Sequence, residues 1–392
     1  MRLLSHSAHP VGWALAALGA MLLAEGAVHA AQPAPLADRQ FCRALPGYRF
    51  AFPRDHFSHP CFRTEWWYFT GNVEASDGRR FGFELTFFRE GINNPHPNPS
   101  RWRVDELYLA HFAITDIENR KFFYTEKMSR AGITLAGASQ QDGRIWNGDW
   151  SAELHGESWK LEAAESGHRI RLQLQPLKPP VLQGRNGVSQ KAEGEGNASH
   201  YYSLTRLETS GELEMGGAVY PVSGWAWMDH EFSTNSLQPH QVGWDWLCLQ
   251  MEDGTEWMLF QLRLKDGGRD PHSAASFVDR DGKAVQLAAE DFQMLPLAYW
   301  KSPRTGGRYP TEWRILAPRL GLDVKISAAI PNQELVTETT GVIYWEGSIV
   351  AQGAHDGRPL EGRGYLEMTG YAGSLTPGLY PQEQSPNQNA GF

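Results

Sequence analysis

The sequence has few cysteines and no excess of basic residues. It holds three cysteines in 392 residues, and 36 lysines and arginines stand against 45 aspartates and glutamates, which gives a net charge of −9. A broad basic surface for nucleic acid is therefore excluded. After the N-terminal segment there is no apolar run of about 18 residues, so we expect a soluble mature chain. Helical periodicity is also scarce, and residues 287–295 are the best candidate for a short helix.

The common motifs of metal and nucleophile chemistry are missing as well. The sequence contains no HExxH, CxxC, GxSxG or Walker A motif. His59, His111 and the run Asp229-His230-Glu231 offer metal-ligand side chains. Adjacent residues of a strand point to opposite faces, so Asp229 and Glu231 can converge but His230 cannot join them. We therefore predict neither a metal nor a cofactor.

The N-terminus reads as a targeting segment. Arg2 precedes the apolar core Val11–Ala24, and Val28 and Ala30 stand at positions −3 and −1 of a cut after Ala30. This pattern predicts a secretory signal peptide over residues 1–30, with an uncleaved anchor as the alternative. No cysteine lies near the cut, which excludes lipid attachment there. We expect a periplasmic protein whose residues 31–40 form a flexible lead-in.

The three cysteines fit an oxidising compartment without proving it. Cys42 and Cys61 lie 19 residues apart in a loop-like stretch and could pair there. The odd count leaves at least one thiol free or bonded to another molecule. Cys248 lies in an aromatic strand, where a small core side chain is the better interpretation.

Aromatic residues, glycine and proline are plentiful. The chain has 15 Trp, 13 Tyr and 18 Phe, with 40 Gly and 24 Pro. Apolar and polar residues alternate over residues 81–87, 170–175 and 322–327, and Asp-Gly pairs follow at residues 77–78, 142–143, 253–254 and 281–282. Alternation separated by Asp-Gly turns is typical of antiparallel hairpins. The sequence therefore predicts an all-β protein.

Three pairs of segments resemble each other in the same order along the chain. Residues 67–89 resemble 244–263, residues 159–174 resemble 313–328, and residues 221–229 resemble 359–367. An internal duplication would produce this order, while chance similarity of β-rich segments is the alternative. We predict an N-terminal barrel over 41–235, a C-terminal barrel over 236–375 and a tail over 376–392.

Several charged residues lie in strongly apolar strands. Glu65 shares a face with Trp67 and Phe69, and Asp245 shares one with leucines. Arg89 and Arg263 end equivalent strands. Charges among aromatic residues are costly unless they are paired. One interpretation is a set of structural ion pairs; the other is a ligand cavity with a few converging polar groups.

Seven motifs together resemble a known family. They are residues 65–71 (EWWYFTG), 87–89 (FFR), 110–116 (AHFAITD), 201–206 (YYSLTR), 227–231 (WMDHE), 243–246 (GWDW) and 362–370 (GRGYLEMTG). Over residues 41–373 the chain is similar to the AttH-like proteins, whose superfamily also contains hydroxyneurosporene synthase, the carotenoid 1,2-hydratase. The resemblance implies two tandem lipocalin-like (calycin) antiparallel β-barrels that arose by duplication. It also implies association with ABC-transporter permeases of the lipoprotein-release type.

The first functional hypothesis is a periplasmic protein that binds a hydrophobic or amphipathic ligand, such as a lipid or a lipoprotein acyl chain. The alternative is a cofactor-independent hydratase of carotenoids or other isoprenoids, and a third possibility is a scaffold with filled barrels. A hydratase needs a carboxylic acid to protonate the alkene, and the candidates are Asp229, Glu231 and Asp245. The predicted ligand-binding residues are His59, Glu65, Trp66, Tyr68, Arg89, His111, Trp227, His230, Trp244, Trp246, Arg263, Tyr344 and Glu346.

Overall fold

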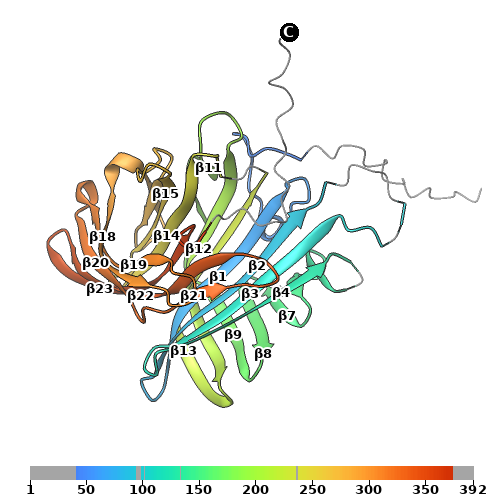
Figure 1. Ribbon diagram of the computed structural model, residues 1–392, viewed down its shortest axis with the longest axis horizontal. Helices are drawn as coiled ribbons and strands as arrows, with labels where there is room; N and C mark the ends of the chain where they lie inside the picture. Colours follow the sequence, from blue (N-terminus) through green and yellow to red (C-terminus); the bar gives the residue numbers. More distant parts are fainter. Residues whose placement is uncertain (1–40, 94–98, 101, 133, 235–236, 374–392) are drawn as a thin grey trace, which may run out of the picture.

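The protein is built almost entirely from two curled antiparallel sheets (Figure 1). The computed structural model describes residues 41–93, 99–100, 102–132, 134–234 and 237–373. The predicted all-β, tandem lipocalin-like fold is confirmed. Within the described ranges, no helix has the length and apolar character needed to cross a membrane. The predictions for residues 1–40 and 376–392 fall outside the described residues.

The first sheet, which we call the N-terminal barrel, runs in the order β4-β3-β2-β1-β13-β12-β9-β8-β7-β6-β5, with β10 and β11 paired to β12. A single turn of 3₁₀ helix, η1 (Arg54–His56), precedes it. The strands are β1 (Thr64–Ala75), β2 (Arg80–Gly91), β3 (Glu106–Asp116), β4 (Lys121–Arg130), β5 (Ala136–Ser139), β6 (Arg144–Asn147), β7 (Trp150–His155), β8 (Ser158–Glu165), β9 (His168–Pro176), β10 (Val181–Leu182), β11 (Val188–Gln190), β12 (Ala198–Met215) and β13 (Ala218–Ser233).

The second sheet, the C-terminal barrel, runs in the order β17-β16-β15-β14-β23-β22-β20-β19-β18, with β21 paired to β22. Its strands are β14 (Gln241–Met251), β15 (Glu256–Leu264), β16 (Ala274–Val278), β17 (Ala284–Ala288), β18 (Gln293–Lys301), β19 (Arg308–Ala317), β20 (Leu322–Ala328), β21 (Glu334–Val336), β22 (Ile343–His355) and β23 (Arg358–Thr369). Two 3₁₀ turns, η2 (Ala289–Asp291) and η3 (Pro318–Leu320), complete it.

The sequence repeats occupy equivalent places in the two sheets. The hairpin β1–β2 corresponds to β14–β15, β8–β9 corresponds to β19–β20, and β13 corresponds to β23, each with the same neighbours in its own sheet. Trp227 on β13 and Tyr365 on β23 therefore belong to different sheets, as the duplication requires. The shared strand order supports the duplication independently of the residue matches.

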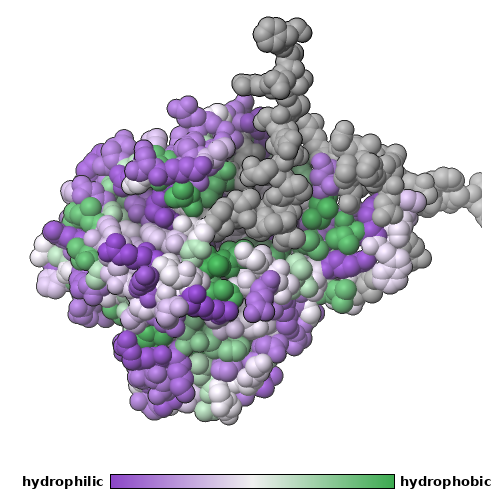
Figure 2. Space-filling model, in the orientation of Figure 1, coloured by the Kyte–Doolittle hydropathy of each residue, from purple (hydrophilic) through white to green (hydrophobic). Residues whose placement is uncertain are grey.

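Each sheet curls around its own apolar core. Trp67, Phe83 and Trp159 lie inside the N-terminal barrel, and Trp257 and Trp313 lie inside the C-terminal barrel. A third apolar cluster joins the outer faces of the sheets where β1, β12 and β13 meet β14, β15 and β23. On the face seen in Figure 2, exposed apolar residues form small separate patches. The large aromatic surfaces are thus used inside the barrels and between them.

One secondary-structure prediction is wrong. Residues 287–295 form the end of β17, the single turn η2 and the start of β18 instead of a short helix. Their helical propensity is weak compared with the backbone hydrogen bonds that β17 makes to β16 and β18 makes to β19. Pro296 also disfavours a helix running on through this segment.

The cysteine pairing that the spacing left open is present. Cys42 and Cys61 form a disulfide, and the Cys42 amide also donates to the Cys61 carbonyl oxygen at 2.8 Å. Cys248 is a buried free thiol that packs between the barrels with Tyr68 and Tyr365. Its predicted role as a small core side chain is confirmed.

Candidate functional site: carboxyl groups between two barrels

The predicted site residues do not form one cavity. Pairing of β1 with β13 places Glu65 and His230 on the inner face of the N-terminal barrel and Tyr68 and Asp229 on its outer face. His59 and Arg89 join the inner group, whereas Asp245 and Arg263 meet inside the C-terminal barrel. The rest lie on the surfaces that face the opposite barrel or at its edge: Trp66, Tyr68, His111, Trp227, Asp229, Glu231, Trp244, Trp246, Tyr344 and Glu346.

The inner group of the N-terminal barrel is a compact ion-pair network around Glu65. Arg89 Nε donates to Glu65 Oε2 at 2.9 Å, while His59 Nδ1 and His230 Nε2 lie 2.7 and 2.8 Å from Glu65 Oε1. Burial alone would raise the pKa of Glu65, but the hydrogen bonds from His230 and His59 and the charge of Arg89 bring it well below its usual range. The ion-pair interpretation of Glu65 and Arg89 is confirmed.

Three members of this network also have the chemistry of metal ligands. Atoms of His59, Glu65 and His230 lie within 4.8 Å of one another. The contacts from both histidines to Glu65 have hydrogen-bond lengths, and Arg89 occupies the second carboxylate oxygen. A metal with bonds of about 2.0–2.2 Å would have to replace this hydrogen bonding. The arrangement therefore fits a structural network better than a metal centre.

The corresponding hairpin of the C-terminal barrel, β14–β15, holds a second ion pair, between a fully buried acid and a partly exposed arginine. Arg263 Nε lies 3.3 Å from Asp245 Oδ2, and Gln261 and Tyr371 donate to the same carboxylate at 2.8 and 2.9 Å. Burial raises the pKa of Asp245, and the charge of Arg263 opposes that shift. Asp245 shares the inner face of β14 with Leu247, so it is turned away from Trp246 and the neighbouring barrel. The structure does not bring it together with Asp229.

The region between the outer faces, which we call the inter-barrel site, is lined by aromatic rings. Tyr68 on β1 is paired directly with Asp229 on β13. The ring of Trp246 on β14 lies 5.2 Å from that of Tyr68 and 6.3 Å from that of Trp227, both edge-on. Trp66 and Trp244 are half-buried against the same cluster. Aromatic faces in this arrangement can enclose an apolar ligand and stabilise a cation.

Asp229 is held at this site by three donors whose directions are fixed. Trp227 Nε1 and Ser203 Oγ donate to Oδ1 at 2.7 and 2.5 Å, and Tyr201 OH donates to Oδ2 at 2.7 Å. The Tyr201 hydroxyl itself accepts from Trp246 at 3.2 Å, and the Ser203 hydroxyl accepts from Gln183 at 2.9 Å. Both hydroxyl protons are thus directed at Asp229. A proton on Asp229 therefore belongs on Oδ2, which accepts only one of the three bonds.

The pKa of Asp229 is set by two opposing effects. Burial favours the neutral acid, while the three hydrogen bonds favour the carboxylate, and the pKa of Asp229 rises to about 7. Such a group exchanges its proton readily near neutral pH. Glu231, two residues along the same face, accepts from Ser199 and pairs with Lys191 at 3.2 Å. Of the two acids that the sequence placed on this face, Asp229 has the environment of an acid–base catalyst.

A second group of buried acids faces Asp229 from the other side of Tyr68. The Tyr68 hydroxyl donates to Glu346 on β22, and Tyr344 OH donates to Glu84 on β2 at 3.1 Å. His111 Nδ1 lies 2.6 Å from Tyr344 OH. Burial raises the pKa of Glu84 to about 7 and that of Glu346 well above its usual range.

Two of these acids lie outside the set of residues predicted from the sequence. Glu84 and Glu367 were not among the predicted site residues, although burial raises the pKa of Glu367 to about 8. Glu367 is the counterpart of Asp229 in the third repeat match, and that equivalence is the signal that could have found it. Glu84 is one of two acids in the apolar strand β2, lies opposite Thr70 and gives only a weak signal.

We predict that Glu84→Gln makes the folded state more tolerant of alkaline pH. A carboxyl whose pKa is raised in the folded state supports folding below its ordinary pKa of 4.5, and this support is lost as pH rises through about 7. The neutral isostere avoids that loss. From pH 5 to pH 8 the free energy of unfolding of the variant should gain about 2 kcal/mol relative to the wild type. Urea unfolding at both pH values measures this gain.

The matched control for this experiment is Glu361→Gln, because Glu361 is an exposed acid on β23. Its difference from the wild type should not change between pH 5 and pH 8. An equal pH response in the two variants would show that Glu84 ionises normally in the folded state.

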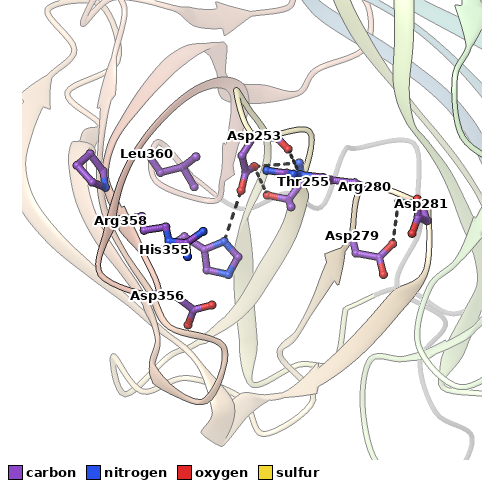
Figure 3. A pocket seen from close by; sticks show the side chains of 10 residues that line it. Asp253, Thr255, Asp279, Arg280, Asp281, His355, Asp356, Arg358 and Leu360 are labelled. Atoms are coloured by element: carbon purple, nitrogen blue, oxygen red, sulfur yellow. Dashed lines mark hydrogen bonds and ion pairs between the residues drawn. The ribbon is translucent and has the colours of Figure 1, made fainter.

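A cavity lies at one end of the C-terminal barrel, away from these acids. Its volume is about 620 Å³, and Figure 3 shows side chains of the β14–β15, β16–β17 and β22–β23 turns around it. Asp253 accepts from Thr255 at 2.7 Å and lies 3.7 Å from His355. The lining is Asp253, Thr255, Asp279, Arg280, Asp281, His355, Asp356, Arg358, Pro359 and Leu360. None of the predicted ligand-binding residues lines this cavity.

Comparison with known proteins agrees with the geometry of the fold. An AttH-type protein of Nitrosomonas europaea has a crystal structure that is 33% identical in sequence, covers 84% of this chain and 100% of its own, and superposes with a TM-score of 0.76. Kievitone hydratase from Nectria haematococca is 15% identical over 86% of this chain and 98% of its own, with a TM-score of 0.64, and thus shares the fold. A search of functionally curated proteins finds no match.

The family model described as AttH-like matches residues 43–371, which span both sheets and every acid of the inter-barrel site. This match and the 33% identity over the whole length of a solved AttH-type chain agree with the motifs recognised in the sequence. We conclude that the chain belongs to the AttH-like family.

Proposed function

We propose that this protein is a cofactor-independent enzyme of the hydro-lyase type, which holds an apolar, unsaturated ligand between its two barrels. The observation that carries the proposal is the environment of Asp229. Its carboxyl is buried, its pKa lies at about 7, and fixed donors leave its proton on Oδ2. An acid with a purely structural role does not need a pKa near neutral pH, whereas an acid that gives and takes a proton does.

The proposed reaction needs only this acid, the aromatic rings and water. Neutral Asp229 gives its proton to one alkene carbon, so a new C–H bond forms and the other carbon becomes a cation. The faces of Tyr68, Trp227 and Trp246 stabilise that charge. Water then bonds to the cation through its oxygen and loses a proton to the Asp229 carboxylate. The net change is the addition of one water, and Asp229 returns to its starting state.

Two comparisons support this reaction class. A structural neighbour is named as a hydratase, although at 15% identity the likeness itself extends to the fold alone. The motifs of the chain also resemble a superfamily that includes the carotenoid 1,2-hydratase. The aromatic enclosure would equally suit a lipid carrier, but a carrier has no use for a carboxyl that titrates near neutral pH. Export to the periplasm and exchange of the ligand with an ABC-transporter permease remain proposals based on the sequence.

Isotope labelling tests the function directly. The purified protein is incubated with a linear carotenoid in detergent micelles and H₂¹⁸O, and the extract is analysed by mass spectrometry. We expect a product that has gained one labelled water. Carotenoid that stays bound and is recovered unchanged would favour a carrier. Neither binding nor turnover would favour a scaffold.

A further inference from the structure

Two carboxylate oxygens at the inter-barrel site have no hydrogen-bond partner among the residues that the structure describes. Glu84 and Glu346 are both fully buried, and one oxygen of each, Oε2, makes no hydrogen bond within the part of the chain that the structure describes. Their other oxygens are used, by Thr86 and Tyr344 at Glu84 and by Tyr68 at Glu346. Leaving a buried polar atom unpaired costs about 1–3 kcal/mol. Two such atoms in one place point to a group that pairs with them when it binds.

The two acids face each other from opposite barrels. Glu84 lies on the outer face of β2, paired with Thr70 of β1. Glu346 lies on β22 and is paired with Glu367 of β23. Tyr344, two residues before Glu346 on the same face of β22, donates to Glu84 at 3.1 Å, which brings the two acids together. Tyr68 donates to Glu346 and is paired with Asp229, so it connects these two acids with the aromatic rings around Asp229.

Among the described residues, no basic side chain forms an ion pair with Glu84 or Glu346. The charges that act on Glu346 come from Glu84 and Glu367, and its only side-chain donor among the described residues is Tyr68. Lys191, a basic residue beside the aromatic cluster, pairs with Glu231 and lies over the Phe260 ring. A ligand carboxylate or phosphate placed here would be buried beside acids without a counter-charge, which is strongly unfavourable.

We propose that Glu84 and Glu346 form a subsite that binds a neutral hydroxyl group of the ligand and excludes anionic ligands. A hydroxyl can donate to one unpaired oxygen and accept from the protonated carboxyl opposite, so both acids are satisfied at once. The inference rests on the proposed function, because it assumes that the ligand binds between the two barrels. It adds that the ligand is an alcohol or becomes one, and that fatty acids and phospholipids are not ligands of this site.

Three probes of equal chain length test the subsite: farnesol, farnesoic acid and the hydrocarbon farnesene. Binding is followed at pH 7 by quenching of tryptophan fluorescence, since Trp227 and Trp246 line the site. We expect farnesol to bind roughly tenfold or more tightly than farnesoic acid, because the acid must bury its charge or give it up. Farnesene should bind more weakly than farnesol, since it leaves both oxygens unpaired.

The subsite is tested with two separate variants, so a folding defect in one of them does not prevent the test. Glu84→Gln and Glu346→Gln should each reduce the preference for farnesol over farnesoic acid severalfold, while the exposed control Glu361→Gln should leave it unchanged. Melting temperature and near-ultraviolet circular dichroism verify the fold of each variant. Farnesoic acid that binds the wild type as tightly as farnesol would overturn the subsite alone. Failure of all three probes to bind would overturn both the subsite and the proposed function.

Discussion

Replacing Asp229 with asparagine is expected to lower the rate of water addition at least about a hundredfold, since an amide cannot give up a proton to an alkene. The variant should fold, because Oδ1, which accepts from both Trp227 and Ser203, can be kept as the amide oxygen. The amide nitrogen then meets only the Tyr201 hydroxyl. The measurement is single-turnover formation of the ¹⁸O-labelled product by wild type and variant at pH 7.

A suitable control is Asp323→Asn, which changes an exposed acid on β20 that is paired with Arg314. It should retain the wild-type rate. Tyr201→Phe adds a finer test, because it removes one of the donors that favour the Asp229 carboxylate. The pKa seen in the pH–rate profile should therefore rise in that variant. Undiminished turnover by Asp229→Asn would exclude Asp229 as the proton donor.

The sequence predicted the faces of the strands well and their partners poorly. Alternation alone separated Asp229 and Glu231 from His230, and the pairing of β1 with β13 confirms that division. The same alternation placed Glu65 on the face of its strand that also carries Trp67. Alternation is a local property with a period of two, so it can be read from a few consecutive residues. It cannot say which face is turned to a barrel's own interior and which to the neighbouring barrel.

The inter-barrel contacts were the part that sequence reasoning could not assemble. Tyr344 meets Glu84 and His111, which lie 260 and 233 residues earlier in the chain. These contacts depend on how the two sheets dock, and docking is decided by the summed packing of the cluster around Tyr68 and Trp246. One list of predicted ligand-binding residues therefore divides into an inner network in each barrel and one site between them.

The internal duplication is visible in the arrangement of charged residues as well as in the fold. Each barrel places an acid and an arginine inside it on the corresponding hairpin, Glu65 with Arg89 on β1–β2 and Asp245 with Arg263 on β14–β15, although their positions within the strands differ. Each also turns an acid toward the other barrel from the equivalent strand, Asp229 on β13 and Glu367 on β23. The two copies thus both have an ion pair inside the barrel and an acid on the outer face of the sheet. In the N-terminal copy this acid, Asp229, accepts three side-chain hydrogen bonds.

Arg89→Met is expected to reduce the free energy of unfolding by about 3–5 kcal/mol, because it leaves the buried Glu65 carboxylate without its guanidinium. Arg89 is fully buried. Besides the bond to Glu65, its Nη2 atom donates to the carbonyl oxygens of His59 and Phe62, each at 2.9 Å. Methionine fills a similar volume but satisfies none of these acceptors. Urea unfolding at pH 7 measures the loss, with the exposed pair variant Arg314→Met as the control that should cost under about 1 kcal/mol.

The double variant Arg89→Met with Glu65→Gln separates ion pairing from packing. If the cost of Arg89→Met comes from an unpaired charge, removing that charge restores part of the stability, and the double variant is more stable than Arg89→Met alone. If the cost comes from packing or from the two carbonyl oxygens, the second substitution adds a further loss. The first outcome is expected, because Glu65 is fully buried and Arg89 is the only permanently charged group that donates to it among the described residues. The network then acts as a fixed brace at the end of β1, and β1 is the strand that also carries Tyr68 to the inter-barrel site.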